Sequence, residues 1–218
     1  MKHHLAADGI ILNFGSRRIL SDIYIKCATG EITGILGRNG HGKSCLLNII
    51  YGSLKPSYKS VRFDDQHVAQ AFLRPDLLTY LPQFNFIPGQ LSLKRVFSDF
   101  GLDYNGFVKW FSEFEDKYEM RMKDLSGGQR RVVEVYVIVK SKSLFSMLDE
   151  PFSHLMPLQI EKVNELIIGE KVSKGFIITD HNFRYVTAIS HTLYVLREGK
   201  MHLTKQLEDI EWLGYARL

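Results

Sequence analysis

The chain has 218 residues, of which 45% are hydrophobic and 24% are charged, a composition that is ordinary for a soluble globular protein. Its formal net charge of +4 is too small to indicate a nucleic-acid partner, and its two cysteines, Cys27 and Cys45, are too few for a disulfide framework, which predicts a reduced, cytosolic compartment. Because no apolar run approaches the roughly 20 residues of a membrane span and the N-terminus lacks a signal-peptide pattern, any membrane part of the function is expected on another polypeptide.

The first part of the chain predicts short strands and one helix around a glycine-rich loop. Alternating or continuous apolar runs favour strands at Ile10–Phe14, Ile19–Ile25, Glu31–Leu36, Val61–Phe63 and Leu78–Leu81. Residues 43–51 have helical spacing. The segment Gly37-Arg38-Asn39-Gly40-His41-Gly42-Lys43-Ser44 therefore lies between an apolar strand and a helix.

That segment has the spacing of a phosphate-binding loop, with Gly37 five positions before Gly42. Its glycines allow successive backbone N–H groups to converge on phosphate oxygens, helped by the start of the following helix. Lys43 is expected to neutralise the β- and γ-phosphates of a nucleotide, and the Ser44 hydroxyl to coordinate Mg²⁺. The alternative, an ordinary glycine-rich turn, is disfavoured because a strand and a helix flank the loop. The residues expected to bind ATP here are Gly37, Asn39, Gly40, Gly42, Lys43, Ser44 and Cys45.

The second part of the chain predicts a helical block followed by alternating strands and helices. Residues 92–123 carry apolar side chains at near-helical intervals, which predicts a small aromatic-rich core made of Val96, Phe97, Phe100, Phe107, Val108, Phe111 and Phe114. A helix, strand, helix, strand and hairpin are then predicted at residues 127–141, 144–148, 158–168, 175–179 and 193–203. Both strands before the hairpin are nearly continuous apolar runs, typical of strands buried on both faces of a parallel sheet. The helical block is therefore inserted into an α/β framework.

Two carboxylates, Asp149 and Glu150, follow the apolar run Leu144–Leu148 and precede Pro151. A carboxylate at the C-terminal end of a buried parallel strand points into the crevice where α/β sheets bind ligands. We therefore expect Asp149 to hold Mg²⁺ through water, and Glu150 to orient and activate the attacking water. Taken without the phosphate loop, the same pair would indicate only a polar strand end with a helix-capping aspartate.

The sequence Leu125-Ser126-Gly127-Gly128-Gln129 begins a predicted helix with two glycines in its first turn. Ser126 fits an ordinary N-cap, whereas each glycine weakens a helix by roughly 1 kcal/mol. That cost is explained if bare N–H groups must approach an anion, and the helix dipole favours a γ-phosphate there. Because the phosphate loop already supplies one cradle, a second one implies two half-sites that meet across a dimer.

In this order the three strings resemble the ATP-binding cassette (ABC) family, in particular the ATPase subunits of bacterial transport systems. Leu125–Gln129 matches the family's signature sequence without a departure, and the resemblance extends from Phe14 to about Leu203. It implies an α/β fold: a P-loop NTPase core with a mainly parallel sheet, an N-terminal antiparallel β subdomain and an inserted α-helical subdomain. The expected division of this single ABC ATPase domain is a nucleotide-binding core of residues 1–87 and 143–218 and a helical signature subdomain of residues 88–142.

The resemblance assigns roles to three further residues. Phe14 takes the position of the aromatic that stacks on adenine, Gln83 that of the glutamine that touches Mg²⁺ and the water, and His181 that of the switch histidine at the γ-phosphate. Taken singly, these residues would be interpreted as a core phenylalanine, a loop glutamine and a solvated or capping histidine. The expected sets are then Glu150, His181, Gln83 and Lys43 for catalysis, Ser44, Gln83 and Asp149 for the metal, and Ser126, Gly127, Gly128 and Gln129 for the nucleotide across the dimer.

Met156 departs from the family pattern. The family usually follows its catalytic Glu-Pro with Ser-Ala-Leu-Asp, whose aspartate communicates across the dimer, whereas this chain has Phe152-Ser153-His154-Leu155-Met156. We expect the lost charge to weaken coupling between the two sites. Two explanations are open: tolerated drift with slower turnover, or a heterodimer in which the partner completes one site.

By the same resemblance, the expected function is a Mg²⁺-dependent ATPase subunit that energises a membrane transporter through ATP-driven dimerisation, peripheral on the inner face of the cell membrane. Its expected partners are transmembrane subunits on separate chains and a second copy or a homologous ATPase chain. The alternative is a soluble single-cassette ATPase of cofactor assembly; a kinase or GTPase would leave Leu125–Gln129 without a use. The strings Thr179–Asn182 and Leu213–Leu218 are similar to the ATPases of lipopolysaccharide export and of branched-chain amino acid transport, and nothing in the chain indicates the cargo.

Overall fold

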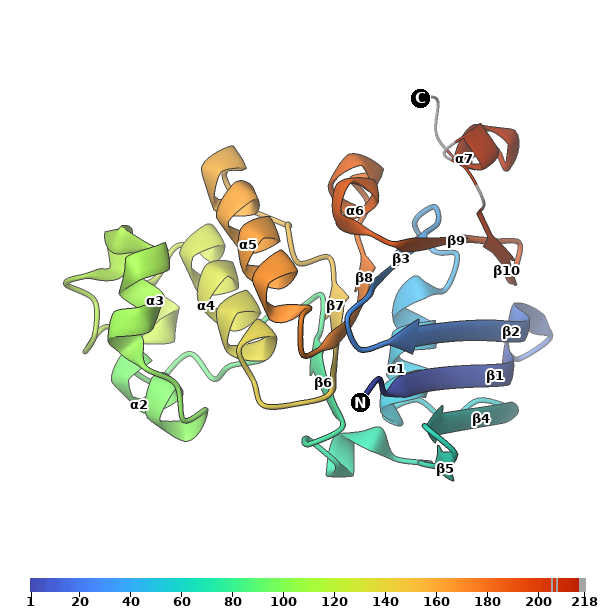
Figure 1. Ribbon diagram of the computed structural model, residues 1–218, viewed down its shortest axis with the longest axis horizontal. Helices are drawn as coiled ribbons and strands as arrows, with labels where there is room; N and C mark the ends of the chain where they lie inside the picture. The colour runs from blue at the N-terminus through green and yellow to red at the C-terminus, as the bar shows by residue number, and fades with distance from the viewer. Residues whose placement is uncertain (205, 207, 216–218) are drawn as a thin grey trace.

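The computed structural model describes residues 1–204, 206 and 208–215, and it contains two β-sheets (Figure 1). The first sheet is antiparallel, with the strand order β2-β1-β4-β5. The second has the order β10-β9-β3-β8-β7-β6 and is parallel except for the β9–β10 hairpin. The strands are β1 (His4–Phe14), β2 (Arg17–Ala28), β3 (Ile32–Leu36), β4 (Tyr58–Phe63), β5 (Gln66–His67), β6 (Leu78–Leu81), β7 (Phe145–Asp149), β8 (Gly175–Thr179), β9 (Thr192–Arg197) and β10 (Lys200–Leu203).

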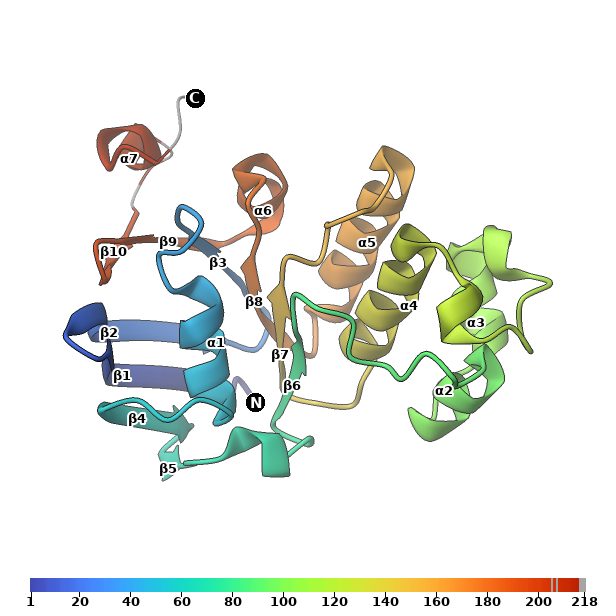
Figure 2. The ribbon, with the colours of Figure 1, turned by 180° about the vertical axis from the view of Figure 1, so that it is seen from behind.

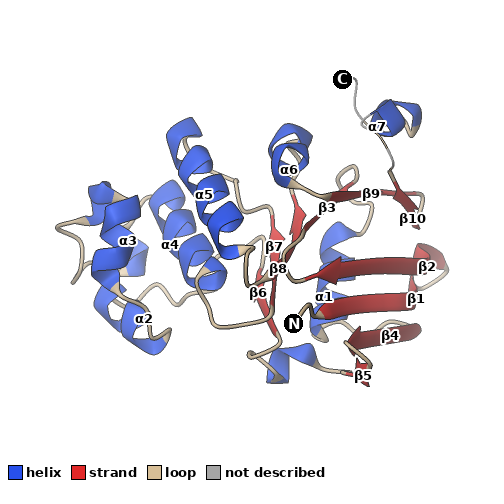
Figure 3. Cartoon of the chain, viewed as in Figure 1, coloured by secondary structure: helices blue, strands red, loops and turns tan. Residues whose placement is uncertain are grey.

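Helices cover both faces of the second sheet (Figures 2 and 3). On one face, α1 packs in a hydrophobic cluster that also contains residues of the antiparallel sheet. On the other face, α4, α5 and α6 pack against the strands, and α2 and α3 form the lobe farthest from the antiparallel sheet. Among the described helices, none has the length and apolar character needed to cross a membrane. The helices are α1 (Lys43–Tyr51), α2 (Leu93–Asp99), α3 (Tyr104–Trp110), α4 (Gly127–Val139), α5 (Pro157–Glu170), α6 (Phe183–Ile189) and α7 (Glu208–Trp212).

The predicted α/β class is confirmed, with its mainly parallel sheet, its separate antiparallel sheet and its inserted helices. Every predicted strand is present, although β1 begins at His4, six residues before the predicted start at Ile10. The early half of β1 pairs with β2 on one side and with β4 on the other, and this double pairing extends the strand beyond its own pattern.

The helical block differs in detail from the prediction for residues 92–123. Gly101, at φ 62°, ends α2, and the carboxylate of Asp103 then caps α3 by accepting the N–H groups of Asn105 and Gly106 at 3.1 and 2.8 Å. Short 3₁₀ turns at Ser112–Phe114 and Met122–Asp124 follow. The predicted aromatic core is confirmed for most of its members, but Phe100 is 37% exposed and does not belong to it.

The parallel strands bring four functional segments to one edge of the sheet. Neighbouring strands β6, β7, β8 and β3 run in the same direction, so their C-terminal ends lie together. The segments that leave this edge are the glycine-rich loop after β3, Pro82-Gln83 after β6, Glu150 after β7 and Asp180-His181 after β8.

The side chain of Lys174 caps the C-terminal end of helix α4, although Lys174 lies 35 positions after Val139 in the sequence. Its Nζ donates to the carbonyl oxygens of Val139 at 2.9 Å and of Ser141 at 2.5 Å, which satisfies acceptors that the helix end leaves free. The side chain is buried, and burial lowers the pKa of Lys174 to about 8, with the charge of Lys140 acting in the same direction.

We expect this lysine to make stability rise with pH. Because the folded-state pKa of about 8 lies below the ordinary 10.5, the unfolded chain binds more protons between these values, and the free energy of unfolding rises by up to about 3 kcal/mol across that window. Lys174→Met should remove this slope, measured by urea unfolding between pH 7.5 and 10.5, whereas Lys142→Met, at an exposed position, should keep it. Equal slopes in the parent and in Lys174→Met would contradict the assignment.

Candidate functional site

A cleft of about 710 Å³ lies at the edge where the four segments meet. Its walls come from the end of β1, the start of β2, the glycine-rich loop with the first turn of α1, and the ends of β6, β7 and β8. All four predicted catalytic residues line it. The lining residues are Phe14, Arg17, Ile19, Asn39, Gly40, Gly42, Lys43, Ser44, Cys45, Gln83, Glu150 and His181.

The glycine-rich loop has a backbone that only glycine adopts without strain at two positions. Gly40 and Gly42 have φ angles of 78° and 96°. Gly42 is also the N-cap of α1 and supplies no side-chain cap, so the first N–H groups of the helix remain free for an anion. Gly37 needs its small size for another reason, because a Cβ there would lie 2.8 Å from the carbonyl oxygen of Leu196. Gly37 lines a smaller neighbouring pocket rather than the main cleft.

Lys43 places its ammonium group between the loop and three carboxylates. Its Nζ donates to the carbonyl oxygens of Gly37 at 2.6 Å and of Arg38 at 3.4 Å, and the residue is only 6% exposed. Burial lowers the pKa of Lys43, and the nearby carboxylates of Glu150, Asp149 and Asp180 oppose that change. The ammonium group is therefore positioned to neutralise a phosphate that enters the loop.

Asp149 lies next to Ser44 and is buried, with 1% of its surface exposed. The Tyr80 hydroxyl donates to its Oδ2 at 3.2 Å, and the Ser44 hydroxyl also bonds to this carboxylate. Burial raises the pKa of Asp149, and the charge of Glu150 adds to the effect, so a divalent cation would relieve an unfavourable buried charge.

The donor set at Asp149 fits Mg²⁺. A hydroxyl, a carboxylate and the amide oxygen of Gln83 are all hard oxygen ligands, which this ion prefers. Among the described residues, no group of three or more His, Cys, Asp or Glu forms a metal cluster. Water and phosphate oxygens would therefore complete the coordination, as is usual for Mg²⁺ at a nucleotide.

Glu150 has an unusual backbone that fixes its side chain at the cleft wall. Its φ of 52° is left-handed, which is uncommon for a residue with a side chain, and its N–H donates to the carbonyl oxygen of Thr179 at 2.7 Å. Its Oε2 accepts a hydrogen bond from Ser153 Oγ at 3.3 Å and lies 3.7 Å from Nδ1 of His181. With its side chain 15% exposed, the carboxylate reaches the cleft without being fully solvated.

Phe14 and His181 both lie in the cleft rather than in the core. Phe14 is 53% exposed, which rules out the interpretation as a core phenylalanine. The His181 side chain is 58% exposed, and its Nδ1 lies 3.4 Å from Oδ1 of Asp180. Asp180 is itself buried and accepts the N–H groups of Phe152 and Asn182 at 3.3 and 2.9 Å. These hydrogen bonds to Asp180 therefore hold in place the segment that carries His181.

The segment Leu125–Gln129 lies away from this cleft. Ser126 is the N-cap of α4 as predicted, since its Oγ accepts the Gln129 N–H at 3.3 Å and Gln129 Oε1 accepts the Ser126 N–H at 3.1 Å. Ser126, Gly128 and Gln129 line a second cleft of about 490 Å³. Figure 1 shows α4 and α1 on opposite sides of strands β6, β7 and β8.

The two glycines that begin α4 have different surroundings. A Cβ on Gly128 would lie 2.6 Å from the carbonyl oxygen of His154, so close packing within this chain already requires a glycine there. A Cβ on Gly127 would meet nothing within 4 Å. Packing within the chain therefore explains the glycine at position 128, but it does not explain the helix-weakening glycine at position 127.

Met156 is the N-cap of α5 and is 69% exposed beside the second cleft. Its φ and ψ of −75° and 154° suit a capping side chain, which methionine lacks. We expect Met156→Asp to stabilise the fold by about 1 kcal/mol, because the carboxylate would accept N–H groups of the first turn. Urea unfolding measures this gain, with Met156→Ala as the reference, and a Met156→Asp variant no more stable than Met156→Ala would contradict it.

Three residues near the site have no role in the sequence-based prediction. Arg17 lines the cleft beside Phe14, Tyr80 holds Asp149, and Arg131 donates to the carbonyl oxygens of Asp149 and Glu150 at 2.6 and 2.9 Å. No local pattern distinguishes Arg131, because it follows Gly127-Gly128-Gln129-Arg130 in the polar first half of α4. The predicted similarity over residues 213–218 extends beyond the described residues, since residues 216–218 lie outside them.

Comparison with known proteins agrees with the geometry. The model of the family described as "ABC transporter" matches residues 20–153, which is more than half of the chain. The chain is similar to the lipopolysaccharide export system ATP-binding protein LptB of Escherichia coli K12, with 27% identity over 90% of this chain and 88% of that protein. It is also similar to the high-affinity branched-chain amino acid transport ATP-binding protein BraG of Pseudomonas aeruginosa, with 22% identity over 90% of each chain.

A solved structure of an ATP-binding subunit of an ABC transporter has the same fold. It superposes with a TM-score of 0.80 at 19% identity, covering 97% of this chain and 93% of that one. The two relatives match the two transport groups that the sequence resembles.

Proposed function

Because the chain belongs to the ABC transporter family, we propose that it is the subunit that binds and hydrolyses ATP to energise a membrane transporter. The transmembrane subunits would be separate chains, and this chain would lie at the cytoplasmic face of the membrane. One observation carries the proposal: Lys43, Ser44, Gln83, Glu150 and His181 line one cleft, whereas Ser126, Gly128 and Gln129 line a different cleft of the same chain.

The separation of the two clefts supports a nucleotide bound between two chains. Ser126 to Gln129 present the N-terminus of a 13-residue helix, with Gly127 open to an approaching group. Within one chain these N–H groups face no phosphate loop. A second copy or a homologous chain, turned so that each helix start faces the other's loop, would complete two equivalent sites.

The main predicted site residues then have defined tasks. Phe14 would stack on the adenine, and Lys43 with the loop N–H groups would bind the phosphates. Ser44, Asp149 and Gln83 would hold Mg²⁺, which supplies neutralisation of phosphate charge when bound. Glu150 would accept the proton of the attacking water, with Ser153 and His181 fixing the carboxylate.

The loop that contains Gln83 is the candidate contact for a transmembrane subunit. Phe84 is 71% exposed, while Phe86 and Leu91 are half-buried against the helical lobe. We propose that residues 88–142 move as a unit relative to the nucleotide-binding core of residues 1–87 and 143–218, so that closure around ATP displaces this loop.

Co-expression with the neighbouring genes of the chromosome tests the transport role. We expect the chain to fractionate with membranes only when the transmembrane partners are present, and to hydrolyse ATP in a Mg²⁺-dependent reaction. A chain that stays soluble with those partners, yet hydrolyses ATP, would support a role in cofactor assembly instead. Absence of ATP binding would contradict the proposal altogether.

A further inference from the structure

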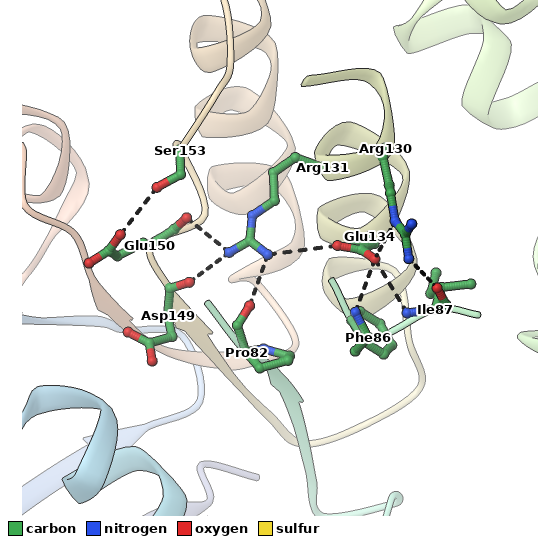
Figure 4. A network of polar contacts seen from close by, with 9 residues as sticks. All are labelled: Pro82, Phe86, Ile87, Arg130, Arg131, Glu134, Asp149, Glu150 and Ser153. Atoms are coloured by element: carbon green, nitrogen blue, oxygen red, sulfur yellow. Dashed lines mark hydrogen bonds and ion pairs between the residues drawn. The ribbon is translucent and has the colours of Figure 1, made fainter. Parts of the chain in front are cut away.

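The first turns of α4 carry charged side chains that hold two separate parts of the site (Figure 4). Arg131 and Glu134 point toward the sheet and are 2% and 0% exposed, which is rare for charged residues. Arg131 reaches the ends of β6 and β7, and Glu134 reaches the loop that follows Gln83.

Arg131 contacts main-chain atoms at the ends of two adjacent strands, β6 and β7. One terminal nitrogen donates to the carbonyl oxygen of Pro82 at 2.8 Å, and the other donates to those of Asp149 and Glu150 at 2.6 and 2.9 Å. The residue after Pro82 is Gln83. A single planar guanidinium therefore connects the backbone at Gln83 with the left-handed backbone of Glu150.

Glu134 holds the other end of the same loop. Its Oε1 accepts the N–H groups of Phe86 and Ile87 at 3.1 and 3.3 Å, and Arg130 donates to the carbonyl oxygen of Ile87. Side chains of α4 therefore hold the backbone on both sides of residues 83–85, at Pro82 through Arg131 and at Phe86 through Glu134. Displacement of this loop must move α4 or break these bonds.

The Arg131–Glu134 pair is a poor source of stability. Arg131 lies 3.8 Å from Glu134, and among the described residues Arg131 Nε and Glu134 Oε2 have no hydrogen-bond partner. Burial lowers the pKa of Arg131 and raises that of Glu134, which reports the cost of removing both charges from water. Four carboxylates, those of Glu134, Asp149, Asp180 and Glu150, partly offset this cost at Arg131. Such a pair is better explained by the geometry it enforces than by stability.

We propose that Arg131 is a positioning residue that couples the Gln83 loop to the carboxylate of Glu150. The inference rests on the proposed function. When the loop and α4 occupy the arrangement seen here, the guanidinium fixes the carbonyl of Glu150 and with it the direction of the side chain toward the attacking water. When the loop moves, the same side chain transmits the displacement to Glu150, so hydrolysis follows the position of the loop that faces the membrane partner.

Arg131→Lys tests the positioning role, because lysine keeps the charge but cannot reach Pro82 and Glu150 at once. We expect kcat for ATP hydrolysis to fall on the order of 10- to 100-fold, since small misplacement of a catalytic group has effects of that size. The dissociation constant for a fluorescent ATP analogue should change less than about twofold, because Arg131 does not line the cleft. Arg95→Lys, an exposed arginine on α2 of the same lobe, should leave kcat unchanged.

Amide hydrogen exchange separates the coupling from the proposed function. In the parent, Mg²⁺-ATP should change exchange at residues 83–87 and at residues 149–152 together, whereas in Arg131→Lys only one segment should respond. A parent that binds no ATP would contradict the proposed function. A parent that responds, with Arg131→Lys showing the same joint response and the parental kcat, would overturn the role of Arg131 and leave the proposed function standing.

Discussion

Glu150→Gln should abolish ATP turnover while leaving ATP binding intact. The amide keeps the shape of the side chain and can still accept a hydrogen bond from Ser153 Oγ, but it cannot take a proton from water. Loss of a general base lowers kcat on the order of 10²- to 10⁴-fold. In the proposed pair of chains hydrolysis is the step that opens the pair, so the variant should also accumulate with ATP bound.

Phosphate release with excess Mg²⁺-ATP measures the turnover of Glu150→Gln, and equilibrium binding measures its affinity. Glu161→Gln, which alters an exposed carboxylate on α5, is the matched control and should behave as the parent. Hydrolysis by Glu150→Gln at the parental rate would refute the role of Glu150 as the base.

Lys43→Met should remove most of the affinity for ATP. Among the described residues that line the cleft, Lys43 is the one lysine, and methionine keeps the length of its side chain without the charge. Charge-assisted hydrogen bonds contribute about 1.5–3 kcal/mol, so affinity should fall on the order of 10- to 100-fold. Asp149, Glu150 and Asp180 would then repel the phosphates without the charge of Lys43 to offset them.

Titration with a fluorescent ATP analogue measures this loss, and Lys55→Met, at an exposed lysine in the turn after α1, serves as the control. Melting temperature without nucleotide separates a binding effect from misfolding. Retention of parental affinity by a folded Lys43→Met would mean that the phosphates bind elsewhere.

The sequence predicted the parts of the site that depend on local pattern. An apolar strand followed by a glycine-rich loop and a helix locates Lys43 and Ser44, and an apolar strand ending in Asp149-Glu150 locates the carboxylates. Parallel pairing of β3, β8, β7 and β6 then brings these ends together, as such runs predict. Of the residues taken from the family resemblance, Phe14, Gln83 and His181 all line the same cleft.

The parts that could not be predicted depend on contacts between distant residues and main-chain atoms. Arg131 meets carbonyl oxygens 18, 19 and 49 positions away, and any residue type offers such a carbonyl. Tyr80 meets Asp149 only because β6 pairs with β7 in one particular register. The short helix α6 was missed because it has only seven residues, begins directly after the β8 end and carries no long periodic pattern. The need for glycine at 128 arises from the position of His154, which no local pattern encodes.

The central claim is that ATP is held between two chains, and the molar mass of Glu150→Gln in solution tests it most directly. Light scattering after size exclusion with Mg²⁺-ATP should give twice the mass of one chain, and adding Ser126→Arg to the same variant should return it to a single chain that still binds ATP. If Glu150→Gln binds Mg²⁺-ATP as a single chain at every protein concentration, both alone and in the presence of a homologous ATPase chain from the same transport system, the account is contradicted.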